Sequence, residues 1–385
     1  MEPATDSPAG KTPSDRGLEV ESGPRQLDPS PPILSRVFRI LTRVFVGPHG
    51  LRAGWSVLFA YCVFYILRIV FGTIFFTANL VDENSGQNAV STIFLELIPF
   101  LSVLGAGAAV AAVEHRSLLS YNLAGPRRLA SSLFGAASGF IALSALIGTL
   151  GLGGWLHFGP CALMGLAGLR FAAIWGCAFL LVGCVEEGIF RCYLLSTLTR
   201  GLNFWWALAA VAGLCAWPWL NGSAGQNDWG VYLIAALGLI PCLILHQRVK
   251  ARSAAFWQAA WVTSTGFGLI HTFNHGENAI GIFAAAAIGF AWCASVRLTG
   301  SAFWAIGCHA AWDWGETFFY GTADSGLVPQ GHLFTTTPAG NPLFSGGADG
   351  PEGSLLIPGA ILLLVAFTFA ARSLLLRINR APHTA

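Results

Sequence analysis

Two adjacent carboxylates and an arginine lie inside an otherwise apolar stretch, residues 171–198. Glu186, Glu187 and Arg191 fall within six positions, and each charge in hydrocarbon costs roughly 2.5 to 3.5 kcal/mol on insertion scales. On a helix, Glu187 and Arg191 are four residues apart and share a face, so they can neutralise each other, whereas Glu186 points about 100° away. A buried ion pair that holds helices together would explain Glu187 and Arg191. It leaves Glu186 without a partner on its own helix.

Three other groups of polar residues lie inside apolar stretches. Arg68 and Glu96, on the first and second stretches, predict a structural ion pair between neighbouring helices. His271 lies in the seventh stretch, and His309 lies in the ninth with Asp313 four residues later on the same face. A lone buried histidine is usually a satisfied core residue, but two on separate spans near an unpaired glutamate are typical of a functional site. Further polar residues expected on the same faces or at the same cavity are His275, Glu316, Asn274 and Asn278.

Composition sets the class of protein. The 385 residues are 54% hydrophobic and only 10% charged, whereas soluble proteins average about 25% charged residues. The chain is therefore predicted to be an all-α, polytopic membrane helical bundle. A net charge of +2 gives no indication of nucleic-acid binding, and the nine cysteines include no CxxC pair that would indicate a zinc site or redox motif.

Apolar stretches long enough to span a membrane, or nearly so, follow one another along the chain. They are residues 54–78, 91–113, 129–150, 171–198, 204–220, 230–246, 255–275, 279–298, 302–320 and 354–376. The fifth and sixth are short and contain Pro218 and Pro241, so the expected count is about eight to ten transmembrane helices. Residues 1–32 and 377–385 are expected to be cytoplasmic tails, the first disordered, and residues 33–46 an amphipathic helix at the membrane surface or a lead-in to the first span.

The basic residues predict the orientation in the membrane. With ten spans and a cytoplasmic N-terminus, fifteen of them flank the spans on the cytoplasmic side: Arg36, Arg39, Arg43, Arg52, Arg116, Arg127, Arg128, Arg200, Arg248, Lys250, Arg252, Arg297, Arg372, Arg377 and Arg380. The opposite loops hold acids such as Asp82, Glu83, Asp228, Glu277, Asp324, Asp349 and Glu352. The positive-inside rule then places both termini in the cytoplasm, and in a bacterium the host membrane would be the plasma (inner) membrane. Residues 321–353 are expected to be a plain loop on the non-cytoplasmic side.

Three short motifs together resemble a known family. Glu-Glu-x-x-x-Arg at 186–191, Phe-x-x-x-His at 267–271 and His-x-x-x-Asp at 309–313, in that order on separate helices, are similar to those of the CPBP (CAAX protease and bacteriocin-processing) intramembrane proteases, which include the type II CAAX prenyl endopeptidases. The resemblance implies a membrane-embedded protease domain over residues 51–376, with the motifs at 186–313. Its expected catalytic residues are Glu186, Glu187, Arg191, His271, His309 and Asp313. The 76 residues between the first two motifs admit two extra spans, so the family's substrate specificity is not carried over.

Peptide hydrolysis needs a base that activates water and donors that stabilise the oxyanion. Glu186 and His271 could hold and deprotonate the water, and His309, oriented by Asp313, could donate to the oxyanion. A zinc ion bound by Glu186, His271 and His309 is the competing mechanism. The resemblance favours a metal-free glutamate protease, and the chain lacks the HExxH spacing of common zinc hydrolases.

The function predicted from the sequence is therefore an intramembrane endopeptidase. Its partners would be the lipid bilayer and a membrane-anchored or lipidated protein or peptide, with cleavage near the substrate's C-terminus as one option and prenylation of the substrate left open. A non-catalytic protein of the same fold, acting in bacteriocin immunity or membrane-protein binding, is the alternative, and a proton-coupled transporter is a weaker one. The full set of motifs favours the enzyme, because a binding protein has no need of an unpaired glutamate beside two histidines.

Overall fold

The computed structural model describes residues 42, 44–47, 50–81, 88–125, 127–248, 252–328 and 330–380. The expected tail 1–32, almost all of the expected surface helix 33–46 and residues 381–385 lie outside this range. The chain divides into Met1–Val44 and Phe45–Ala385, and the description below concerns the second unit alone.

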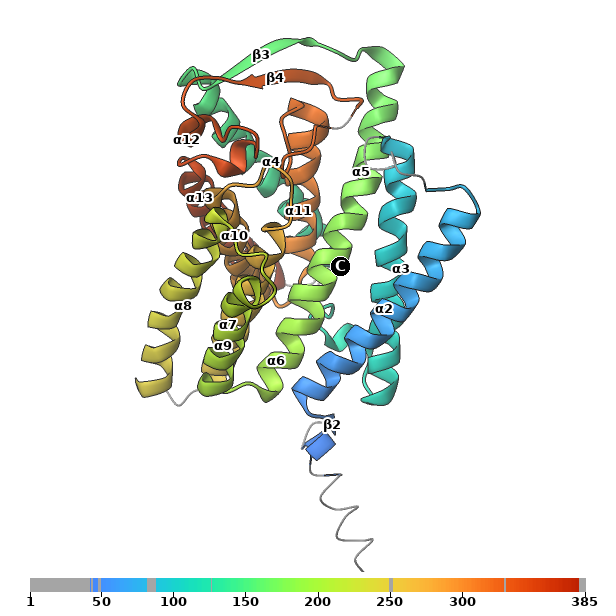
Figure 1. Cartoon of the computed structure of the whole chain (residues 1–385), viewed down its shortest axis with the longest axis vertical. Coiled ribbons are helices and arrows are strands. Elements are labelled where there is room, and N and C mark those ends of the chain that lie inside the picture. Colours follow the sequence, from blue (N-terminus) through green and yellow to red (C-terminus); the bar gives the residue numbers. More distant parts are fainter. Residues whose placement is uncertain are drawn as a thin grey trace, which may run out of the picture. The chain divides into compact units, whose positions relative to one another are not determined.

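The helices coincide with the ten predicted apolar stretches (Figure 1). They are α2 (Ala53–Thr77), α3 (Ala89–Val113), α4 (Arg128–Leu152), α5 (Gly165–Glu187) continued by η3 (Gly188–Leu194) and α6 (Leu195–Gly201), α7 (Phe204–Leu220), α8 (Trp229–Arg248), α9 (Arg252–His271), α10 (Ala279–Thr299), α11 (Phe303–Trp314) continued by η5 (Gly315–Tyr320), and α13 (Ile357–Arg380). The short elements are β1 (Val46–Gly47), β2 (Gly50–Leu51), η2 (Leu118–Ser120), β3 (Leu156–Cys161), η4 (Gln226–Asp228), β4 (Phe334–Pro338), α12 (Pro342–Ser345) and η6 (Pro351–Gly353).

Seven helices of the described residues are long and apolar enough to cross a membrane, and α7 is a shorter apolar helix. Large apolar side chains are exposed along several of them, α2 above all, as expected where the surrounding solvent is lipid. The chain is therefore an integral membrane protein with an all-α polytopic bundle. Two predicted spans do not meet these limits, because α9 carries several polar residues and α11 has only 12 residues before η5 begins.

Hydrogen bonds between connections define two ends of the bundle. At one end, which we call the β3–β4 end, β3 pairs antiparallel with β4 across the top of the view in Figure 1. At the same end Asn227 donates to the backbone oxygen of Glu277 (2.7 Å), and the backbone N–H of Asn278 donates to Asp349 (3.1 Å). At the other end, which we call the Glu114 end, Glu114 forms an ion pair with Arg200 (2.9 Å). The connections at each end are thus tied to one another.

Small residues bring α4 and α11 into close contact. On α4, Gly135 and Gly139 face the backbone of α11 at Trp304 and Cys308, and a Cβ at either glycine would overlap a carbonyl oxygen there. On α11, Gly307 faces the α4 backbone in the same way. Such small-xxx-small patterns let helix backbones approach closely in membranes. The helix that carries the third motif is therefore held firmly against α4.

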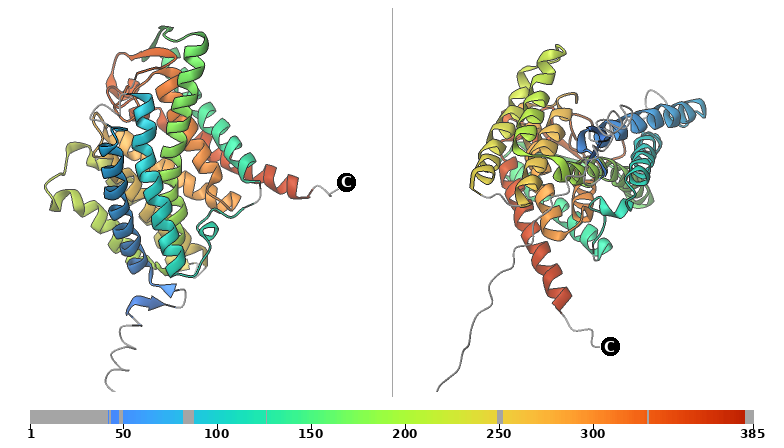
Figure 2. Two further views of the ribbon diagram at one scale, coloured as in Figure 1. Left: turned by 90° about the vertical axis from the view of Figure 1, so that its right-hand side faces the viewer. Right: turned by 90° about the horizontal axis from the view of Figure 1, so that it is seen from below.

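The helix that carries the first motif runs from α5 through η3 to α6 without a break. Figure 2 shows α5 beside α3, which packs against it, and α11 packs against it as well. The segment η3, which directly follows Glu187, is a π-helix, and so is η5, which follows the third motif. Single π turns inside helices occur often at functional sites, and here each begins within two residues of a motif carboxylate.

Candidate active site

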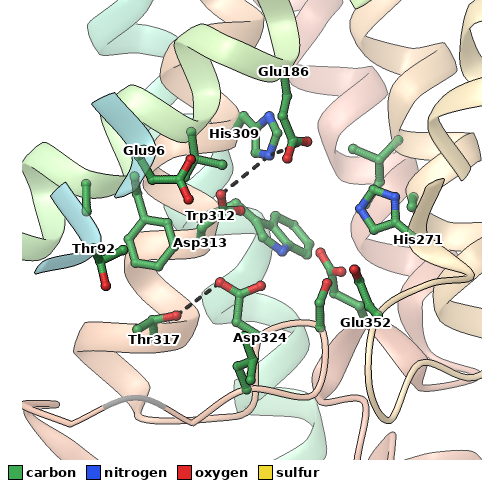
Figure 3. A pocket seen from close by; sticks show the side chains of 18 of the residues that line it. Thr92, Glu96, Glu186, His271, His309, Trp312, Asp313, Thr317, Asp324 and Glu352 are labelled. Atoms are coloured by element: carbon green, nitrogen blue, oxygen red, sulfur yellow. Dashed lines mark hydrogen bonds and ion pairs between the residues drawn. The ribbon is translucent and has the colours of Figure 1, made fainter. Parts of the chain in front are cut away.

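A cavity of about 350 Å³ lies between α3, α5, α9, α10 and α11. Figure 3 shows its polar side chains, with Glu186 and His309 near one another, His271 to one side and Asp324 and Glu352 at the edge formed by loops. Four of the predicted site residues line the cavity, one from each of α5 and α9 and two from α11: Glu186, His271, His309 and Asp313. The other two, Glu187 and Arg191, lie behind them.

Glu187 and Arg191 form the ion pair that their spacing predicts. Arg191 Nη1 lies 3.2 Å from Glu187 Oε1, and neither side chain is exposed. The guanidinium carbon also lies 4.2 Å from the centre of the Phe267 ring and 5.1 Å from the Trp292 ring. Cation–π contacts of this kind are worth more when the cation is desolvated. The guanidinium fits against α10 because residue 289 is a glycine. A Cβ at Gly289 would overlap Arg191 Nη2.

His309 is held by a carboxylate that the sequence assigned to Arg191 alone. Its Nδ1 lies 3.0 Å from Glu187 Oε1, so the N–H at Nδ1 donates to the carboxylate that already accepts from Arg191. Its Nε2 lies 3.4 Å from Asp313 and 3.8 Å from Glu186. The ring also stacks on Trp292, with centroids 4.5 Å apart. The closest polar partner of the imidazole is therefore Glu187, and Asp313 lies beside the nitrogen that faces the cavity.

The Phe-x-x-x-His spacing fixes the orientation of His271. Its Nδ1 lies 2.7 Å from the backbone oxygen of Phe267, and a donated proton at Nδ1 leaves Nε2 as an acceptor. Glu186 reaches into the cavity with 30% of its side chain exposed. The expectation that His275 continues the same helical face is wrong, because α9 ends at His271 and His275 is an exposed turn residue.

The loop after η5 also lines the cavity, so the expectation of a plain loop at 321–353 is wrong. Asp324, which accepts a hydrogen bond from Thr317 (3.0 Å), and Glu352 both face the cavity. Burial raises the pKa of Asp324 to about 6. Burial, and then the charge of Asp324, raise the pKa of Glu352 to about 8. No helical periodicity connects these two carboxylates to the motifs, so sequence patterns gave no signal for them.

Three other expectations are corrected in part. No ion pair within 4 Å joins Arg68 to Glu96 among the described contacts, and Glu96 lines the cavity with Glu186. Asn274 lines the cavity as expected, whereas Asn278 caps α10 and donates to backbone oxygens of the 346–353 segment. Glu316 is buried and is not among the residues that line the cavity.

The zinc alternative concerns the donor atoms of Glu186, His271 and His309. Within the described residues, no three His, Cys, Asp or Glu side chains converge in a way that could hold a metal ion. The nearest atoms of Glu186 and His309 are 3.8 Å apart, and His271 lies to the other side of the cavity in Figure 3. Glu186, His271 and His309 share the cavity, and the metal-free mechanism stays a prediction.

The part of the chain that contains the second and third motifs is similar to a known family. The family model of type II CAAX prenyl endopeptidase Rce1-like proteins matches residues 242–315. The match spans α9 to α11 and therefore covers the second and third motifs, and it is consistent with the predicted CPBP resemblance. No curated protein and no solved structure matches the chain. The first motif lies outside the Rce1-like match, and its link to the site is the geometry of Glu186, Glu187 and Arg191.

Proposed function

We propose that this protein is an intramembrane endopeptidase that cleaves a membrane-anchored or lipidated polypeptide. The observation that supports it best is that Glu186, His271 and His309, from three separate helices, line one cavity. The Rce1-like match over two of those helices agrees with a protease. A membrane protein that only binds a partner has no need of this arrangement. Placing charged side chains inside the membrane costs free energy, so an arrangement of this kind is typical of a functional site.

In the proposed mechanism Glu186 is the base. A water held between Glu186 and Nε2 of His271 attacks the carbonyl carbon of the scissile bond, and Glu186 takes the proton that the water loses. His309 donates from Nε2 to the oxyanion of the tetrahedral intermediate. The protonated Glu186 then gives its proton to the amide nitrogen as the carbon–nitrogen bond breaks. No metal takes part in these steps.

Glu187, Arg191 and Asp313 position the reacting groups. Glu187 accepts from Nδ1 of His309 and from Arg191 at once, which fixes the ring so that Nε2 faces the cavity. Arg191 is fixed in turn by the aromatic rings around it. Asp313, 3.4 Å from Nε2, supports a protonated His309, and a cationic ring is a stronger hydrogen-bond donor than a neutral one.

The test compares two glutamine variants side by side. Glu186→Gln removes the base but leaves the ion pair intact, so it should melt like wild type and lose about 10²- to 10⁴-fold of its activity. Glu187→Gln leaves Arg191 without a counter-charge and should lower stability by about 3–5 kcal/mol. Thermal melts in detergent and cleavage of a fluorogenic membrane peptide measure the two effects. Wild-type cleavage by Glu186→Gln would rule out the proposed mechanism and favour a non-catalytic protein of this fold.

A further inference from the structure

The cavity reaches only one end of the bundle in the described part of the chain. Its lining includes Asn274 from the α9–α10 connection, Asp324 and Leu327 from the segment after η5, and Glu352 from η6. All of these connections belong to the β3–β4 end. None of the residues that line the cavity comes from the connections at the Glu114 end.

Toward the Glu114 end the cavity is closed by packed side chains. Arg191 lies one helical turn beyond Glu187 in that direction and is fully buried, with Phe190, Phe267 and Trp292 around its guanidinium. From Glu186 the helix continues for 15 residues to Gly201, or at most about 22 Å at the 1.5 Å per residue of an α-helix. A polypeptide approaching from the Glu114 end between η3 and α10 would have to displace this buried ion pair to reach Glu186.

The two ends also differ in charge. Among the described residues, connections and helix ends at the Glu114 end carry most of the basic residues outside the N-terminal segment and α13: Arg52, Arg116, Arg127, Arg128, Arg200, Arg248, Arg252 and Arg297. The described residues of the β3–β4 end include one basic residue, Arg170, near the start of α5, and its connections carry Asp228, Glu277, Asp324, Asp349 and Glu352. Positively charged loops stay in the cytoplasm during insertion, which assigns the Glu114 end to the cytoplasmic side.

From these observations together we infer that the active site opens to the non-cytoplasmic side of the membrane. Its substrate is then a membrane-anchored polypeptide whose scissile bond lies at, or just beyond, the non-cytoplasmic end of its anchor. A C-terminus that carries a lipid on the cytoplasmic side would meet the closed end of the cavity. The inference rests on the proposed protease function and adds the side from which the substrate enters.

The first experiment maps cleavage sites without assuming a sequence. Membrane proteins of cells with wild type and with Glu186→Gln are compared for new N- and C-termini. The expected result is a set of termini that falls at least tenfold in the variant and maps to the non-cytoplasmic ends of membrane anchors. Glu186-dependent termini at cytoplasmic ends, or at cytoplasmic lipidated C-termini, would overturn the inference while keeping the protease function. If no terminus depends on Glu186, the protease function fails and the inference about its substrate fails with it.

A second experiment tests the orientation separately from catalysis. Cys161 in β3 is an exposed free thiol at the β3–β4 end, so a membrane-impermeant maleimide should label it in intact cells. Cys161→Ser should lose that label. Adding Ser120→Cys, in η2 at the Glu114 end, to the Cys161→Ser protein should restore labelling only after permeabilisation. The reverse pattern would show that the cavity opens to the cytoplasm and would overturn the inference whatever the activity.

Discussion

Gly289 offers the sharpest test of how the ion pair supports the site. It is buried in α10, and an added Cβ would overlap Arg191 Nη2 and come within 3.2 Å of Phe267 Cδ1. The guanidinium has no free space in which to move, because the side chain is fully buried among aromatic rings. Gly289→Ala should therefore push Arg191 away from Glu187 without removing any charged group.

The size of the effect follows from two opposing contributions. In a helix interior, replacing Gly by Ala ordinarily stabilises by up to about 1 kcal/mol. Breaking a buried ion pair costs about 3–5 kcal/mol. The expected net loss of stability is therefore about 2–4 kcal/mol. Activity should fall as well, because Glu187 also fixes His309.

The assay compares melting temperatures in detergent and cleavage rates with those of a matched control. Gly148 in α4 has no heavy atom within 4 Å of an added Cβ, so Gly148→Ala should be as stable as wild type, or more stable, and fully active. Gly289→Ala should melt at a clearly lower temperature. If the two variants prove equally stable and equally active, the guanidinium is not confined as described, and the coupling between Arg191 and His309 must be abandoned.

Three further predictions concern Asp313, the acidic loops and metal dependence. Asp313→Asn can still accept a hydrogen bond and should keep cleavage within roughly 100-fold of wild type, whereas Asp313→Leu should be far worse; equal rates would count against a positioning role. Burial, together with repulsion from Asp349, raises the pKa of Glu277 to about 9, and burial raises that of Asp349 to about 7. Because the folded state then binds more protons than the unfolded state, the melting temperature should fall as pH rises from about 4 to 9, and Asp349→Asn should flatten that fall; a melting temperature that rises over this range would contradict it. Purified protein should keep its activity in chelator, and elemental analysis showing one zinc per chain whose removal abolishes cleavage would replace the metal-free mechanism.

The sequence predicted the helices well for a physical reason. In lipid, backbone polar groups must bond within the segment, so every long apolar stretch is confined to a helix. The same local rule predicted the Glu187–Arg191 pair, because residues four apart share a helical face. Both features depend on neighbours in sequence, and the structure has both.

Features that depend on how helices meet could not be read in the same way. The contact between Glu187 and His309 joins positions 122 residues apart, and no local pattern indicates it. Glu96 was assigned to the nearest opposite charge, Arg68, but the packing of α3 against α5 directs it to the cavity. The loop carboxylates Asp324 and Glu352 follow no helical periodicity.

The pairing of β3 with β4 has a consequence for the timing of assembly during synthesis. Phe158 pairs with Thr336, and the two are separated by about 180 residues, which a ribosome adds in roughly 10 to 40 seconds at 5–20 residues per second. Until then β3 has no strand with which to pair, because β4 belongs to the α11–α13 connection, which also supplies Asp324 and Glu352 to the cavity. A nascent chain therefore holds all three motifs, the last of which ends at Asp313, before β4 and the loop carboxylates of the cavity have been made. For the protease proposed above, the cavity would then be completed only after the last motif has been made.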